Sequence, residues 1–88
     1  MITRKVKVVN PTGLHLHPAG ALCELADKYE SFVHFKYGDN AEANAKSVLS
    51  ILGACVRQGD EIELVIDGVD EEEAMEAITR LIESGFVH

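Results

Sequence analysis

Two histidines, His15 and His17, lie in the segment Leu14-His15-Leu16-His17-Pro18, just before a stretch with helical periodicity. Pro18 suits the first turn of a helix, where the N–H that proline lacks is not needed. The sequence therefore predicts His15 at a helix N-terminus, where free backbone N–H groups and the positive end of the helix dipole converge. A phosphate on His15 would find hydrogen-bond donors there, and the dipole favours the neutral imidazole that can act as a nucleophile.

Other roles for these histidines are also open from the residues alone. His15 can simply cap the helix or lie in a loop, and the His15-x-His17 spacing is compatible with a metal site. No Cys, Asp or Glu lies between Thr3 and Leu22, so a third ligand, His34 or His88, would have to come from elsewhere in the chain. We therefore expect no metal and no cofactor. A hydrolase is also disfavoured, because no carboxylate lies near the histidines to activate water.

The elements that position these residues follow from hydrophobic periodicity. Apolar residues alternate with polar ones over 5–8, 33–37 and 61–67, which predicts three strands, and a turn at 38–40 predicts a short fourth strand over 41–44. Apolar residues with helical spacing over 19–26, 48–56 and 74–82 predict three amphipathic helices. Asp70 and Glu73 are expected to form a capping box at the start of the last helix, and Gly85 to end it. The predicted order is βαββαβα, with the helices on one face of a four-stranded sheet.

Composition limits the possible classes of protein. A chain of 88 residues with 47% hydrophobic and 26% charged residues is expected to form one globular domain over residues 1–88. It contains no apolar run long enough for a membrane span and no signal-peptide pattern, so we expect a cytoplasmic protein. The net charge of −7 disfavours nucleic-acid binding. The acidic excess lies in residues 59–88, which carry a charge of −9, whereas residues 1–58 carry +2.

The two cysteines, Cys23 and Cys55, each fall within a helical apolar stripe and show no CxxC pairing. We interpret them as buried free thiols, with a disulfide as the alternative.

Three motifs together resemble one known family. They are Gly-Leu-His-x-x-Pro-Ala around His15, Ala45-Lys46-Ser47-Val48-Leu49 at the start of the second helix, and Gln58-Gly59-Asp60-Glu61-Ile62 leading into a strand. Over nearly the whole chain the sequence resembles HPr, the histidine-containing phosphocarrier of the bacterial phosphotransferase system. The resemblance implies an α+β fold, the open-faced βαββαβα sandwich, with a four-stranded antiparallel sheet. It also implies that His15 takes a phosphoryl group from enzyme I and donates it to enzyme IIA domains, as a monomeric, stoichiometric carrier rather than an enzyme.

The resemblance assigns further roles to the second helix and its surroundings. Ser47 matches a serine that an HPr kinase/phosphorylase modifies in some members, although serine is also a preferred helix N-cap. A partner-binding surface, extending in some members to a transcriptional regulator, is implied for six residues: Thr12, Leu16, Gly20, Val48, Leu49 and Leu52. Val48 and Leu52 can equally be core residues, whereas Leu49 falls off the buried stripe and is the best candidate for an exposed contact.

One residue departs from the family pattern. His17 stands where the family has an arginine, and histidine does not provide a permanent cation with a fork of donors. This leaves an alternative: a regulatory paralogue that acts by protein binding, with weakened phosphotransfer. Residues 71–86 look more like the nitrogen-branch than the sugar-branch carrier, and the branch stays open. A ligand-binding module or an RNA-binding sheet would share the element order but lacks its glycine-rich or aromatic motif here.

Overall fold

The computed structural model describes residues 1–87 and has the predicted βαββαβα order. The strands are β1 (Ile2–Lys7), β2 (Phe32–Tyr37), β3 (Ala41–Asn44) and β4 (Glu61–Asp67). The helices are α1 (Leu16–Ala26), α2 (Val48–Gly53) and α3 (Glu71–Glu83). The predicted short strand over 41–44 is therefore confirmed, even though its residues have weak β propensity, because each of them pairs with β2.

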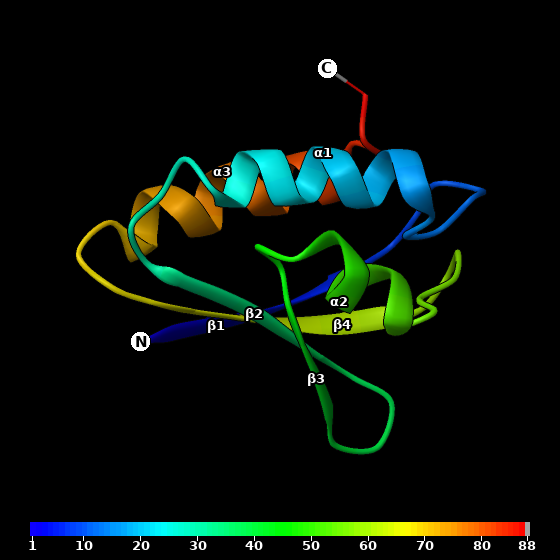
Figure 1. The fold of residues 1–88 in the computed structure, drawn as a ribbon, viewed down its shortest axis with the longest axis horizontal. Helices are drawn as coiled ribbons and strands as arrows, with labels where there is room; N and C mark the ends of the chain where they lie inside the picture. Colours follow the sequence, from blue (N-terminus) through cyan, green and yellow to red (C-terminus); the bar gives the residue numbers. More distant parts are fainter. Residues whose placement is uncertain (88) are drawn as a thin grey trace.

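The four strands form one antiparallel sheet in the order β1-β4-β2-β3. All three helices cover the same face of this sheet, as Figure 1 shows. Alternate residues of β4, Ile62, Leu64 and Ile66, are buried under the helices, and Val6 and Phe35 join them from neighbouring strands. The structure thus confirms the open-faced sandwich, since the alternation in each strand buries one face only.

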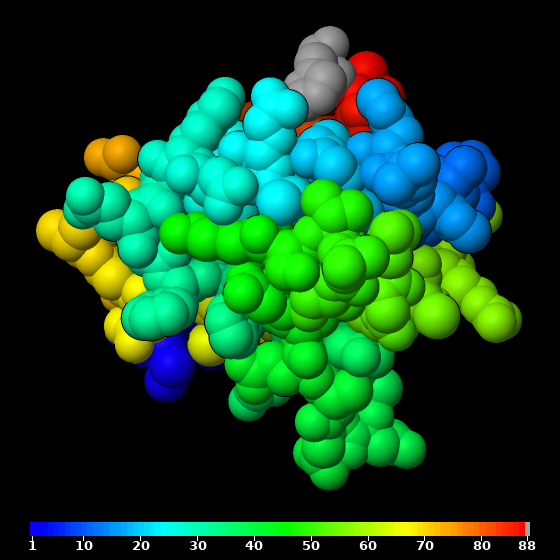
Figure 2. All heavy atoms as spheres, viewed as in Figure 1, coloured from blue at the N-terminus to red at the C-terminus, as the bar shows by residue number. Residues whose placement is uncertain are grey.

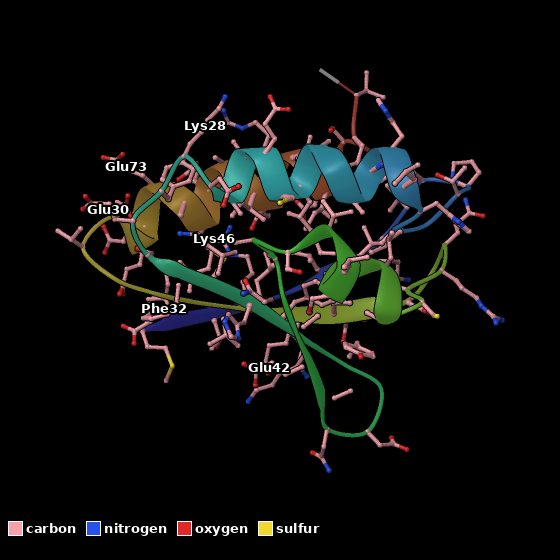
Figure 3. All side chains as sticks on the ribbon, viewed as in Figure 1. Lys28, Glu30, Phe32, Glu42, Lys46 and Glu73 are labelled. Carbon is pink, nitrogen blue, oxygen red and sulfur yellow. The ribbon has the colours of Figure 1, made fainter. Side chains whose placement is uncertain are left out.

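The predicted capping box at the start of α3 is wrong. Asp70 is the N-cap residue, but its side chain makes no capping hydrogen bond. Its carboxylate instead accepts hydrogen bonds from the Glu30 N–H (2.9 Å), the Ser31 N–H (3.0 Å) and the Ser31 hydroxyl. Glu73 lies exposed on the first turn of α3 (Figure 3). Asp70 therefore joins the α1–β2 loop to the β4–α3 loop, a long-range contact that a local motif does not reveal. The predicted end of α3 is confirmed, because Gly85 follows it with a φ of +74°.

The two cysteines are free thiols, as predicted, but the prediction that both are buried is wrong. Both thiols are free, but Cys23 is only half-buried and Cys55 is exposed. The helical stripe does not reach Cys55, because α2 ends at Gly53 and Cys55 has a left-handed φ of +52°. Burial, with the nearby Asp27 carboxylate, raises the pKa of the Cys23 thiol. The Cys23 thiol is therefore less reactive than an exposed one.

Within residues 1–87, no helix combines the length and the apolar character needed to cross a bilayer.

Candidate phosphoryl-acceptor site

His15 is the N-cap residue of α1, as its position before Pro18 predicted. Its backbone is extended, with φ −76° and ψ −172°, and its carbonyl oxygen accepts the Ala19 N–H at 2.8 Å. The imidazole makes no capping hydrogen bond, and the side chain is exposed. His15 therefore begins the helix through its backbone and leaves its ring nitrogens accessible to another molecule.

Two backbone donors beside His15 have no acceptor within the described residues. The first N–H groups of a helix have no intrahelical acceptor, and here these belong to Leu16 and His17. Pro18 has no N–H, and the Ala19 N–H is used by His15. Within residues 1–87 no acceptor is bonded to the N–H of Leu16 or His17. The start of α1 therefore offers an anion two aligned donors and the positive end of the helix dipole.

The loop before His15 is fixed by close backbone packing. Gly13 has a φ of +61°, and a Cβ atom at this position would lie 2.8 Å from Arg57 Cα and still closer to the Val56 carbonyl oxygen. The next residue, Leu14, donates its N–H to that same oxygen at 3.0 Å. Only glycine fits both the left-handed conformation and the contact. The segment after α2 therefore holds the loop that presents His15.

A second set of hydrogen bonds ties the end of β1 to the loop before β4. Val8 exchanges hydrogen bonds with this loop, accepting from the Gly59 N–H at 2.7 Å and donating to the Asp60 carbonyl at 2.9 Å. The Gln58 amide donates to the Val9 carbonyl at 3.0 Å. Both ends of the loop that carries His15 are thus anchored, one by β1 and one by α1.

The predicted site residues on α1 lie together beside α3. Leu16, His17 and Gly20 line a groove between α1 and α3, with Ser84 and Val87 on the opposite wall. Leu16 is 70% exposed, and nothing lies within 4 Å of the position that a Gly20 Cβ would take. Within residues 1–87, therefore, no packing contact requires a glycine at this position of α1.

The predicted residues on α2 form a second group on the neighbouring helix. Figure 2 shows α1 and α2 side by side on one face of the molecule. Leu49 is 82% exposed, as predicted, whereas Val48 and Leu52 are partly buried against the core. Ser47 is the N-cap of α2 and accepts the Ser50 N–H at 3.2 Å, so its predicted capping role is confirmed. Thr12 lies in the loop before His15, where its hydroxyl accepts a hydrogen bond from the Asn10 amide at 3.0 Å.

Two nearby residues had no role in the sequence-based prediction. Asn10 is buried and donates two hydrogen bonds within the loop before His15. Lys46 donates to the Tyr29 carbonyl at 2.7 Å, and Figure 3 shows its side chain under the turn that follows α1. For Asn10 a sequence signal existed, since asparagine before Pro-Thr-Gly is typical of a turn closed by its own side chain. No local pattern predicts the Lys46 contact.

Comparison with known proteins shows which family the chain belongs to. The protein-family model described as "PTS HPr component phosphorylation site" matches residues 2–84. The chain belongs to the HPr family of phosphocarriers of the phosphotransferase system. Among curated HPr relatives, the phosphocarrier protein HPr of Treponema pallidum is 34% identical over 86 residues, covering 98% of this chain and 97% of the relative. The phosphocarrier protein NPr of Proteus mirabilis is 39% identical over 83 residues, covering 94% and 92%.

A solved HPr structure agrees with the fold. The crystal structure of HPr-C-His from Thermoanaerobacter tengcongensis superposes with a TM-score of 0.93 at 40% identity, covering 98% of this chain and 96% of that chain. The whole βαββαβα unit is therefore an HPr fold.

Proposed function

We propose that this chain is a phosphocarrier whose His15 accepts a phosphoryl group from enzyme I and donates it to an enzyme IIA domain. The observation that carries the proposal is the exposed His15 imidazole at the start of α1, next to the unoccupied N–H groups of Leu16 and His17. Membership of the HPr family supports it.

In the proposed transfer, the unprotonated nitrogen of the His15 imidazole attacks the phosphorus atom of the donor. The bond between phosphorus and the donor breaks, and the donor keeps its electron pair. The phosphoryl oxygens then accept hydrogen bonds from the Leu16 and His17 N–H groups, which lie at the positive end of the helix dipole. The second transfer moves the same group to the acceptor and restores His15, so the protein acts as a carrier in stoichiometric amounts.

The proposed docking surface consists of Thr12, Leu16, Gly20, Val48, Leu49 and Leu52. The most exposed apolar members, Leu16 and Leu49, lie on the neighbouring helices α1 and α2. Exposed apolar side chains that gather on neighbouring elements mark candidate protein-interaction surfaces. We propose that one monomer presents this surface, as a single domain, first to enzyme I and then to the acceptor.

Ser47 is proposed as a regulatory phosphorylation site for an HPr kinase/phosphorylase. It caps α2 next to Leu49, so a phosphate there would add nearly two negative charges beside the docking surface. The proposed consequence is weaker binding of enzyme I and an altered preference for regulatory partners.

A regulatory paralogue is the second candidate, and His17 is the observation that favours it. An arginine at this exposed position would give the phosphate a permanent cation, whereas a histidine gives one only when protonated. In this alternative, protein binding, including binding to a transcriptional regulator, matters more than the transfer rate.

The experiment is incubation with phosphoenolpyruvate and enzyme I, followed by intact mass measurement before and after acid treatment. We expect an acid-labile gain of one phosphoryl group in the native chain and none in His15→Ala. The variant should remain folded, because an exposed N-cap side chain without a capping bond contributes little to stability. Full phosphorylation of His15→Ala would refute the assignment, and an unphosphorylated native chain would favour the regulatory paralogue.

A further inference from the structure

We propose that Asn10 is a positioning residue for phosphotransfer, because its side-chain amide closes the turn that presents His15. The inference rests on the proposed carrier function. The Asn10 side chain is only 7% exposed, and its Nδ2 atom donates to the Gly13 carbonyl at 2.8 Å and to the Thr12 hydroxyl at 3.0 Å. The Gly13 N–H returns a hydrogen bond to the Asn10 carbonyl at 3.1 Å. The turn is therefore closed by three hydrogen bonds that involve Asn10.

The orientation of the Asn10 amide is set by its partners. The Gly13 carbonyl can only accept a hydrogen bond, so the NH₂ group, not the oxygen, must face it. The amide oxygen then points to a place where no hydrogen-bond partner exists within the described part of the chain, although the atom is buried. A buried acceptor without a partner costs stability. The Asn10 amide nevertheless places an N–H donor on the Gly13 carbonyl. Neither an ionised Asp side chain nor a Leu side chain has such a donor.

The Asn10 amide donates its hydrogen bond to Gly13, the residue whose packing sets the position of the loop. Gly13 lies directly against the backbone of residues 56 and 57, and Leu14 is bonded to the Val56 carbonyl oxygen. His15 follows Leu14 immediately. If the turn opened, Gly13 would lift from this contact and the His15 imidazole would shift relative to the free N–H groups of Leu16 and His17. A shift of about 1 Å in a reacting group can reduce a rate by roughly a hundredfold.

The sharpest test is Asn10→Asp, which keeps the shape of the side chain and removes both donated hydrogen bonds. We would measure the single-turnover rate of transfer from phosphorylated enzyme I over a range of carrier concentrations, at a temperature where circular dichroism shows each variant folded. We expect the rate at saturation to fall at least about tenfold, while the half-saturating concentration changes less than about twofold, because presentation of His15 and not docking is altered.

The matched control is Ile66→Val, a buried substitution in β4 that lowers stability without touching the loop. A positioning role predicts that this variant transfers at the native rate, whereas a general loss of stability would slow both variants alike. A second variant keeps the test usable if Asn10→Asp does not fold. Thr12→Val loses one acceptor of the Asn10 amide and should slow the transfer at saturation by about fivefold, the rate equivalent of one hydrogen bond, at an unchanged half-saturating concentration.

The results separate the two proposals. Loss of the saturating rate in Asn10→Asp or Thr12→Val, with a native rate in Ile66→Val, supports the positioning role. Native rates in Asn10→Asp, or in Thr12→Val if Asn10→Asp is unfolded, overturn the positioning role alone. A native chain that takes no phosphoryl group overturns the carrier function and the positioning role with it.

Discussion

His17 is exposed on the first turn of α1 and supplies one of the two free backbone donors beside His15. Its N–H group does not depend on the side chain, so a histidine keeps this donor as well as an arginine would. The side chain differs, because an imidazole is charged only at mildly acidic pH and a guanidinium is charged throughout the physiological range. At the scale of one residue, the protein therefore has a permanent donor and a conditional cation at the same position.

We expect His17→Arg to raise the rate of phosphoryl exchange with enzyme I mainly at alkaline pH. An imidazole gains a charge at mildly acidic pH but loses the lone pair needed for attack, so the native rate should pass through an optimum. The measurement is the exchange rate between about pH 5.5 and 8.5, the range over which histidines titrate. The control is His34→Arg on β2, remote from the site and bonded to Glu42 at 2.7 Å. The hypothesis fails if His17→Arg changes the rate by one constant factor at every pH.

Predictions from the sequence succeeded at this scale where the determinant is local. Ser47 was predicted as an N-cap and Leu49 as exposed, because both follow from helical position alone. Cys55 was predicted to be buried and is exposed, because α2 ends at Gly53, before its apolar periodicity ends. The side-chain hydrogen bonds of Asn10 were missed, although asparagine before Pro-Thr-Gly is a local turn signal.

At the scale of elements, α2 presents one side chain to solvent and packs the others. Leu49→Ala should therefore change the free energy of unfolding by no more than about 0.5 kcal/mol, the usual range for an exposed site. If Leu49 anchors the docking surface, the same change should weaken binding of enzyme I by roughly tenfold. Calorimetric titration and urea unfolding measure the two quantities. Val69→Ala, at an exposed residue in the β4–α3 loop, is the control and should affect neither.

Ser47→Asp tests the role of α2 in docking by adding a negative charge at its N-terminus. Aspartate is also a good N-cap, so the hydrogen bond from the Ser50 N–H and the stability of α2 should be retained. We expect weaker binding of enzyme I because a negative charge now lies beside Leu49. Equal affinity of Ser47→Asp and the native chain, at equal stability, would leave Ser47 as a cap only.

The contact between Asp70 and the α1–β2 loop predicts how stability depends on pH. The hydrogen bond from Ser31, followed by the one from the Glu30 N–H, lowers the pKa of the Asp70 carboxyl. A folded-state pKa below the unfolded value of about 3.9 stabilises the protein above that pH, and this contribution is lost as the pH falls towards the folded-state pKa. Asp70→Asn should therefore lower the urea midpoint at pH 7 and reduce its decrease between pH 7 and pH 3.

Asp39→Asn is the matched control for this prediction, because Asp39 lies exposed in the turn between β2 and β3. It should leave the urea midpoint at pH 7 close to the native value. An equal decrease of the midpoint from pH 7 to pH 3 in Asp70→Asn and in the native chain would contradict the proposed contribution of Asp70.

At the scale of the whole molecule, element types and their order followed from the sequence because each strand and helix carries its own periodicity. The strand order β1-β4-β2-β3 was not predicted from the residues, since pairing between distant strands leaves no local pattern. For the site, the place of His15 at the start of α1 was predictable from Pro18 and the helical spacing. The anchoring of its loop was not, because Val56 and Arg57 are distant in the sequence from Gly13.

The pairing of β1 with β4 has a consequence for the order in which a newly made chain becomes competent. β1 lies at the edge of the sheet and pairs with β4, from Ile2 with Ile66 to Lys7 with Glu61. During synthesis β1 therefore leaves the ribosome long before its partner exists, and closing so large a loop delays folding. The segment that holds Gly13 also comes late, and a helix as short as α1 is marginal alone in water. His15 is thus translated early but held in place only after residues 56–67 have been made, so we expect a nascent chain that ends before β4 to present no ordered acceptor for a phosphoryl group.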